Sequence, residues 1–264
     1  MTAPTSNLQA IYNSAIFYVS GFQPVVATNT TLTVQSGLCR DQANSMDINV
    51  GDYFGAQNPT TVNIATTGLN ALDTGTVAAS TVYALWAIAD AGNYNPSGLL
   101  LSTSLTQPVV PSGVFPSGYG NIRLVRYAVT NASSQFITTK ASGNGNMTTY
   151  TFDAPVRVLN AGAATTQTPI NLASCVPAVD GELAIVQATF TPATAGHTAT
   201  LVTSGGTIAN SKFIVTGQVA AVPITQVFTI PVSLITGVPE IDYELTNGSD
   251  ALSVYVIGFT QLHK

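Results

Sequence analysis

The sequence predicts an all-β protein built from two antiparallel β-sandwich domains, jelly-roll or immunoglobulin-like, in tandem. Runs of alternating apolar and polar residues recur about every 8–12 residues, the spacing of antiparallel sandwiches and barrels. Clusters of Gly, Asn, Ser and Asp, which favour turns, separate the runs. No segment of about 11 or more residues has convincing helical periodicity, and Asn7–Phe17 is the best candidate for one.

The strand-like runs of the first half differ in how they alternate. Thr30–Leu38 places Thr and Gln on one face and Leu and Val on the other, which predicts a half-buried strand. Val82–Ala89 is almost continuously apolar and contains the single tryptophan, Trp86, so we expect it to be buried on both faces. Further strands are predicted at Asn121–Thr130, Gln135–Lys140, Met147–Phe152 and Val156–Leu159.

The second half continues the same rhythm with shorter turns. Residues 153–168 interrupt it with a stretch of small residues suited to a linker or an exposed loop. The sequence therefore predicts an N-terminal β domain at 1–155 and a C-terminal β-sandwich at 156–264. Its strands are expected at Ile170–Ala173, Leu183–Phe190, Ala199–Thr203, Lys212–Thr216, Gln226–Val232, Ile241–Leu245 and Leu252–Phe259.

Charge is scarce, at 7% of residues, while hydrophobic residues make up 45%. Seven Lys and Arg against 12 Asp and Glu give a net charge of −5 and no basic patch, so nucleic-acid binding is not expected. No apolar run reaches the ~18 residues of a membrane span. The first basic residue is Arg40, so a signal peptide is not expected either. So neutral a surface favours packing into a larger assembly.

No constellation of residues predicts catalysis, a cofactor or a metal. His197 and His263 have no second ligand nearby, and the Gly-x-Ser-x-Gly and Gly-x-x-x-x-Gly-Lys motifs are absent. Cys39 and Cys175 are expected to be free, buried thiols, with a disulfide between them as the alternative.

Acidic residues give two weaker signals. Glu240, Asp242 and Glu244 alternate, so a strand would place them on one face. We interpret them as an exposed face that resists edge pairing; a sugar-cleaving carboxylate set is the alternative. Oxygen ligands for calcium are present in this row, at Asp41, Asp47 and Asp52, and in the loop after Asp90, but none of these segments has a dense calcium-loop pattern.

Three aromatic residues lie in the two longest predicted loops. Tyr94 is in the loop at 90–98, and Phe115 and Tyr119 are in the loop at 107–120. Aromatic side chains on loops can stack on sugars or anchor an interface. They are therefore the candidate interface or glycan contacts; the alternative is that they fold back and close the end of a sandwich.

Several phrases resemble a pattern found in virion structural proteins of tailed bacteriophages. These phrases cover about two-thirds of the chain and have no catalytic content. They are Leu38-Cys39-Arg40-Asp41, Asp47-Ile48, the run from Ser80 to Ile88, Gly98–Ser104, Pro111-Ser112-Gly113, Pro116-Ser117-Gly118-Tyr119, Ile122-Arg123-Leu124-Val125 and Ile170–Pro177.

The resemblance implies a non-enzymatic component of a phage virion, attached to the capsid or tail as a head fibre, tail-fibre-like or decoration protein. It would be a homo-oligomer, with a trimer expected, that contacts the major capsid or tail protein and host-surface glycans. Its location would be the virion, after synthesis in the host cytoplasm. The alternative function is a carbohydrate-binding or adhesin module of a bacterial surface protein.

Overall fold

The computed structural model describes residues 18–53, 56–90, 97–110, 119–144, 147–179, 181–206 and 212–262. These residues form strands, turns and loops, so the predicted all-β class is confirmed. Asn7–Phe17 lies outside them. No helix in these ranges has the length and hydropathy needed to cross a bilayer.

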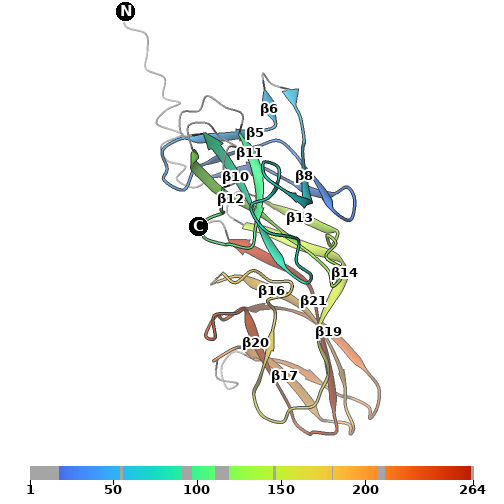
Figure 1. The fold of residues 1–264 in the computed structure, drawn as a ribbon. Coiled ribbons are helices and arrows are strands. Elements are labelled where there is room, and N and C mark those ends of the chain that lie inside the picture. The colour runs from blue at the N-terminus through green and yellow to red at the C-terminus, as the bar shows by residue number, and fades with distance from the viewer. Residues whose placement is uncertain are drawn as a thin grey trace, which may run out of the picture.

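The N-terminal strands form a seven-stranded sheet, a three-stranded sheet and one short hairpin (Figure 1). The large sheet has the order β12-β10-β11-β9-β8-β3-β2, and the small one has the order β1-β4-β5. The strands are β1 (Val19–Gly21), β2 (Pro24–Val26), β3 (Thr31–Val34), β4 (Gly37–Arg40), β5 (Asp47–Val50), β6 (Asp52–Tyr53), β7 (Ala56–Gln57), β8 (Thr60–Thr67), β9 (Ala71–Leu72), β10 (Val82–Asp90), β11 (Gly98–Ser102) and β12 (Tyr119–Val129).

The C-terminal strands form a five-stranded sheet, β13-β14-β21-β16-β19, and a four-stranded sheet, β15-β20-β17-β18. Side chains from both sheets meet in one apolar core, so this half is a sandwich. The strands are β13 (Thr139–Asn144), β14 (Met147–Gly162), β15 (Thr168–Asn171), β16 (Leu183–Thr191), β17 (Thr198–Thr203), β18 (Lys212–Thr216), β19 (Ile224–Pro231), β20 (Glu240–Leu245) and β21 (Ala251–Leu262).

Strand β10 is buried along its whole length, as its apolar sequence predicts. Tyr83 and Leu85 pack in the core shared with the three-stranded sheet. Ala84 and Trp86 face the other side and pack in the core of the C-terminal sandwich. The two halves are therefore joined by packed apolar side chains as well as by the chain itself.

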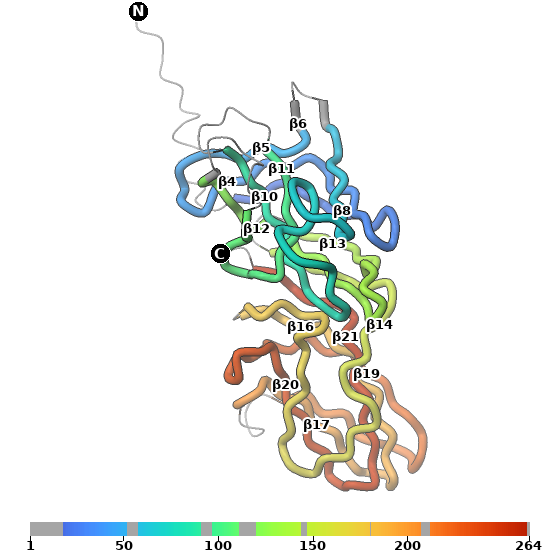
Figure 2. Tube along the Cα trace, in the orientation of Figure 1, coloured from blue at the N-terminus to red at the C-terminus, as the bar shows by residue number. Residues whose placement is uncertain are grey.

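Two long strands connect the halves (Figure 2). β14 runs through the predicted boundary between residues 155 and 156, and Met147–Gly162 pairs with β21 over most of its length. At the junction, the Tyr150 hydroxyl donates to Gln261 Oε1 at 2.6 Å and accepts from Tyr127 N at 3.1 Å. The Tyr150 ring stacks on Phe259 with the ring centroids 4.5 Å apart. The boundary at 155/156 stays a prediction.

Four strands predicted from the sequence differ from the observed ones. Thr30–Leu38 is two strands in different sheets, because the chain turns at Gln35–Ser36 between β3 and β4. Gln135–Lys140 is mostly irregular, and β13 starts at Thr139 and includes Ser142–Asn144, expected to be a turn. Met147–Phe152 and Val156–Leu159 are one strand, because β21 pairs with both segments across register shifts.

Candidate functional site

The outer face of the three-stranded sheet carries a polar surface with a groove. Val19, Cys39 and Ile48 pair across the three strands and are buried in the core. Neighbouring residues along a strand point to opposite faces. The next cross-strand row, Ser20–Leu38–Asn49, therefore faces away from that core.

A groove of about 630 Å³ lies on this face. Hydroxyl, amide and backbone groups line it together with Leu38 and Pro59, and none of its lining residues is charged. Behind it, the buried Arg126 donates from Nη2 to the Gly21 carbonyl oxygen at 2.7 Å and fixes β1. The lining residues are Ser20, Gly21, Gln35, Ser36, Gly37, Leu38, Asn49 and Pro59.

Close backbone contacts hold the groove in shape. Gly21 has a φ of 78°, and a Cβ there would overlap the Ser36 carbonyl oxygen. A Cβ on Gly37 would overlap the ring of Phe22, which is itself fully buried. Larger residues therefore do not fit at these two positions without a shift of the backbone or of Phe22.

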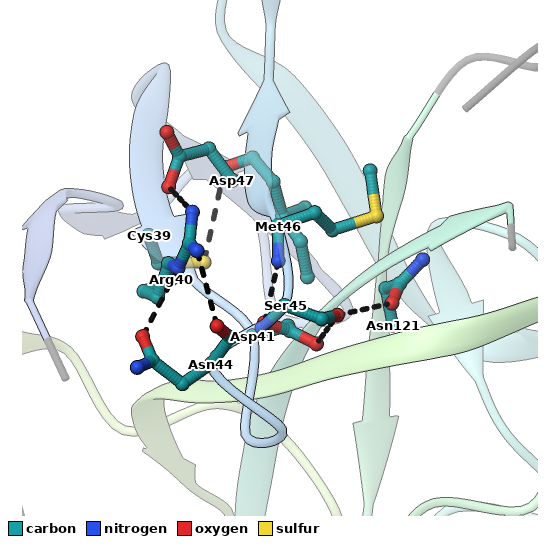
Figure 3. Close-up of polar contacts among 9 residues, drawn as sticks. Cys39, Arg40, Asp41, Asn44, Ser45, Met46, Asp47 and Asn121 are labelled. Carbon is teal, nitrogen blue, oxygen red and sulfur yellow. Dashed lines mark hydrogen bonds and ion pairs between the residues drawn. The ribbon is translucent and has the colours of Figure 1, made fainter. Parts of the chain in front are cut away.

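The loop between β4 and β5 borders the same face and is built around Asp41 (Figure 3). Asp41 is buried; its Oδ1 accepts hydrogen bonds from Ser45 N at 2.6 Å and Met46 N at 3.0 Å. Its Oδ2 accepts a hydrogen bond from Ser45 Oγ at 2.7 Å. Burial alone would raise the pKa of this carboxyl, but the hydrogen bonds to its charged form outweigh burial and lower the pKa.

Arg40 closes the loop from outside. Its Nε and Nη2 donate to the side chain and carbonyl oxygens of Asn44, and its Nη1 forms an ion pair with Asp47 at 3.0 Å. Burial and the nearby Asp47 raise the pKa of the Tyr18 phenol beside the same strand end. A planar cation–carboxylate pair therefore lies at one end of the outer face and the neutral groove at the other.

The loop is also tied to the large sheet. Gln42 N donates to the Ile122 carbonyl oxygen at 2.9 Å, and Asn121 Nδ2 donates to the Asp90 carbonyl oxygen at 3.2 Å. Residues Asp90 and Tyr119 pair directly between β10 and β12. The ends of the two loops predicted to carry the aromatic contacts therefore meet next to the 41–46 loop.

The aromatic residues predicted from the sequence are not tested by this arrangement. Tyr94 and Phe115 lie outside the described residues. Tyr119 is the first residue of β12, and only its backbone is described. The sequence does not reveal the groove, because its lining residues are scattered over four short segments. The spacing from Asp41 to Ser45 is typical of a side-chain-capped turn and signals only the neighbouring loop.

The acidic row of β20 is not an exposed edge, and that expectation was wrong. β20 lies between β15 and β17, and Glu240 and Asp242 are buried. Asp242 Oδ2 accepts from Gln167 Nε2 at 2.6 Å. Alternation places the acids on one face, but it does not reveal that Gln167 and Gly205, from other segments, reach that face.

Three further titratable side chains of the described chain, Cys39, Cys175 and His197, have structural partners. Cys39 and Cys175 are free and buried, which confirms the first interpretation. His197 Nδ1 lies 2.9 Å from Oδ1 of the buried Asp250. Within the described ranges no three His, Cys, Asp or Glu side chains converge as metal ligands; His263 lies outside them.

Comparison with known proteins gives no family. No family model matches the chain, and no curated protein matches it significantly. A carbohydrate-binding module of Cellvibrio mixtus lichenase 5A, solved with cellotriose, has a TM-score of 0.21 at 14% identity and covers 48% of this chain and 88% of its own. The infectious bursal disease virus Gx strain structure has a TM-score of 0.24 at 14% identity, with 93% and 71% covered. The Cry4Aa toxin of Bacillus thuringiensis has a TM-score of 0.20 at 8% identity, with 92% and 51% covered. These scores are too low to carry an argument.

Proposed function

We propose that this chain is a non-enzymatic structural component of a bacteriophage virion, attached to the capsid or tail as a fibre or decoration protein. In this proposal two sandwich units, jelly-roll or immunoglobulin-like, stand in tandem: one docks on the particle and the other is exposed to the host. The chain self-associates and contacts host-surface glycans through its exposed unit.

The observation that carries the proposal is that an all-β protein has a surface with very few charged residues. Five of the phrases that resemble virion proteins lie on β4, β5, β10, β11 and β12, and Ile170–Pro177 begins on β15 in the other half. Residues 183–239 contain one charged side chain, Lys212. Surfaces of this kind associate by shape and by burial of uncharged groups, because there is little charge to desolvate.

Binding to purified particles tests the attachment. The chain should co-sediment with capsids or tails that lack it, and the binding should be nearly insensitive to salt, because few ion pairs can be screened. If the chain stays in the supernatant at every protein concentration and ionic strength, the virion assignment is wrong.

The alternative, a carbohydrate-binding or adhesin module of a bacterial surface protein, is favoured by the groove on the three-stranded sheet. Its hydroxyl and amide lining is the chemistry that hydrogen-bonds neutral sugar hydroxyls. A glycan array with the isolated chain distinguishes the carbohydrate-binding function from the virion scaffold function. In this alternative Ser20→Arg, which fills the groove, abolishes a glycan signal that Thr61→Arg on β8 leaves intact. Binding to particles without any glycan signal favours the scaffold role.

A further inference from the structure

Strand β19 forms one edge of the five-stranded sheet. It pairs with β16 from Ile224 to Pro231 without a register shift, and no other strand of the described chain pairs with it. Natural edge strands are protected by charges, bulges, internal prolines or covering segments, because unpaired N–H and C=O groups recruit other strands. Between Pro223 and Pro231, β19 has no charge, bulge or proline, and Val227 is 57% exposed.

The segment that contains this edge is nearly uncharged and partly apolar. Lys212 is the single charged residue between positions 183 and 239, although the whole chain carries 7 basic and 12 acidic residues. The turn that precedes β19 exposes Val219 and Val222, and Ala221 N anchors it to the Pro192 carbonyl oxygen at 2.7 Å. Two copies, each with a net charge of −5, meet little charge repulsion along a strand that carries no charged side chain.

The edge is also symmetric about Val227. Pro223 and Pro231 each lie four residues from it, and proline has no N–H to continue a ladder. In an antiparallel pair of two β19 strands centred on Val227, Thr225 lies opposite Thr229, and Val227 lies opposite its own copy. Cross-strand pairs of β-branched residues are favourable, and within the chain Thr225 already lies 3.0 Å from Thr189 by their hydroxyl oxygens.

We propose that β19 is a homodimer seam, where a second copy of this chain adds its own β19 antiparallel about a two-fold axis at Val227. The five-stranded sheets of the two copies then form one continuous sheet, and the prolines stop the ladder at both ends. Such a contact is closed, since the same patch serves both copies. The inference deepens the proposed assembly role and departs from the expected trimer, but it concerns the purified chain alone.

Sedimentation of purified protein tests the seam. Wild type should be a dimer whose association is half complete on the order of 10 µM, as expected for a seam at the small end of specific interfaces. Val227→Lys should be monomeric, because the two-fold axis would bring the two new ammonium groups together. Thr61→Lys, which adds the same charge on the exposed face of β8, should stay dimeric. Circular dichroism checks that both variants are folded.

A second, covalent test does not require the fold to accept a lysine at position 227. Val227→Cys should form an intermolecular disulfide under mild oxidation, because directly opposed strand residues lie at bonding distance. Thr61→Cys should stay monomeric on a non-reducing gel; the native cysteines are buried. The proposal would be overturned if the wild type were trimeric, or monomeric at about 200 µM. It would also be overturned by a dimeric Val227→Lys variant or by equal cross-linking of the two cysteine variants. Failure to bind particles would instead count against the virion assignment alone.

Discussion

Asp41 is the residue on which the loop between β4 and β5 depends most. Its carboxylate accepts two backbone hydrogen bonds and one from the Ser45 hydroxyl, and it is 1% exposed. Hydrogen bonds to a buried charged group each contribute more than neutral ones, and loss of the acceptor leaves donors unpaired.

Asp41→Ala should lower the free energy of unfolding by about 2–4 kcal/mol, as measured by urea titration, because three donors lose their acceptor. Asp47→Ala is the matched control. Its ion pair with Arg40 is at the surface, so the loss should be below about 1 kcal/mol. Equal losses for the two variants would show that Asp41 does not organise the loop.

Asp41 also makes the stability of the folded protein depend on pH in the acid range. The hydrogen bonds hold the folded pKa of Asp41 below its ordinary value of about 3.9. Its contribution to stability is therefore complete above that ordinary value and is lost as the pH falls through the folded pKa. The stability gap between wild type and Asp41→Asn should be constant from pH 7 to about 5 and shrink below about 4. A gap that widens on acidification would contradict this assignment.

The two cysteines should be inert in the folded protein. Burial raises the pKa of each thiol to about 12, and the thiolate is the reactive form. A thiol reagent at pH 8 should label neither Cys39 nor Cys175 in the native state and both in denaturant. If Cys39 or Cys175 is labelled rapidly in the native state, the apolar core around that cysteine opens locally.

At the scale of elements, the pairing of β14 with β21 holds the molecule together. The ladder passes from the junction into the C-terminal sandwich and bends through register shifts. Gly258 lies at one of the close approaches, where a Cβ would overlap the Tyr150 carbonyl oxygen.

Gly258→Ala should destabilise the fold by about 1–3 kcal/mol in thermal or urea unfolding, because the β14 backbone must move to admit a methyl group. Gly248→Ala is the control, because the nearest atom to its Cβ is 3.7 Å away and its effect should be within about 0.5 kcal/mol. A neutral Gly258→Ala would mean that the ladder is looser than this contact requires.

At the scale of the whole molecule, the two halves share packed side chains. Trp86 and Tyr127 from the N-terminal half lie in the same apolar cluster as Val254 and Phe259. Tyr127 and Phe259 meet edge to face, with ring centroids 5.9 Å apart. The N-terminal half of β14 contributes to this cluster through Tyr150 and Phe152.

A fragment covering residues 139–264 should therefore be more stable than one covering 156–264. The shorter fragment lacks β13 and the part of β14 that pairs with residues 258–262 of β21, so it should expose Phe259. Circular dichroism, thermal unfolding and binding of a hydrophobic dye measure the difference. Equal stability and equal dye binding would favour an independent domain starting at 156.

The sequence alone determined the all-β class, the doubly buried β10 and the burial of both cysteines. The first two follow from local composition and period, which a strand retains wherever it is placed, and free cysteine is among the residue types most often buried. Only the tertiary structure decided that Glu240 and Asp242 lie in an inner strand, and that Thr30–Leu38 splits between two sheets. The groove and the free edge of β19 also come from tertiary structure. The reason is that strand neighbours are chosen by contacts between distant segments, and alternation records which face a residue takes but not what covers it.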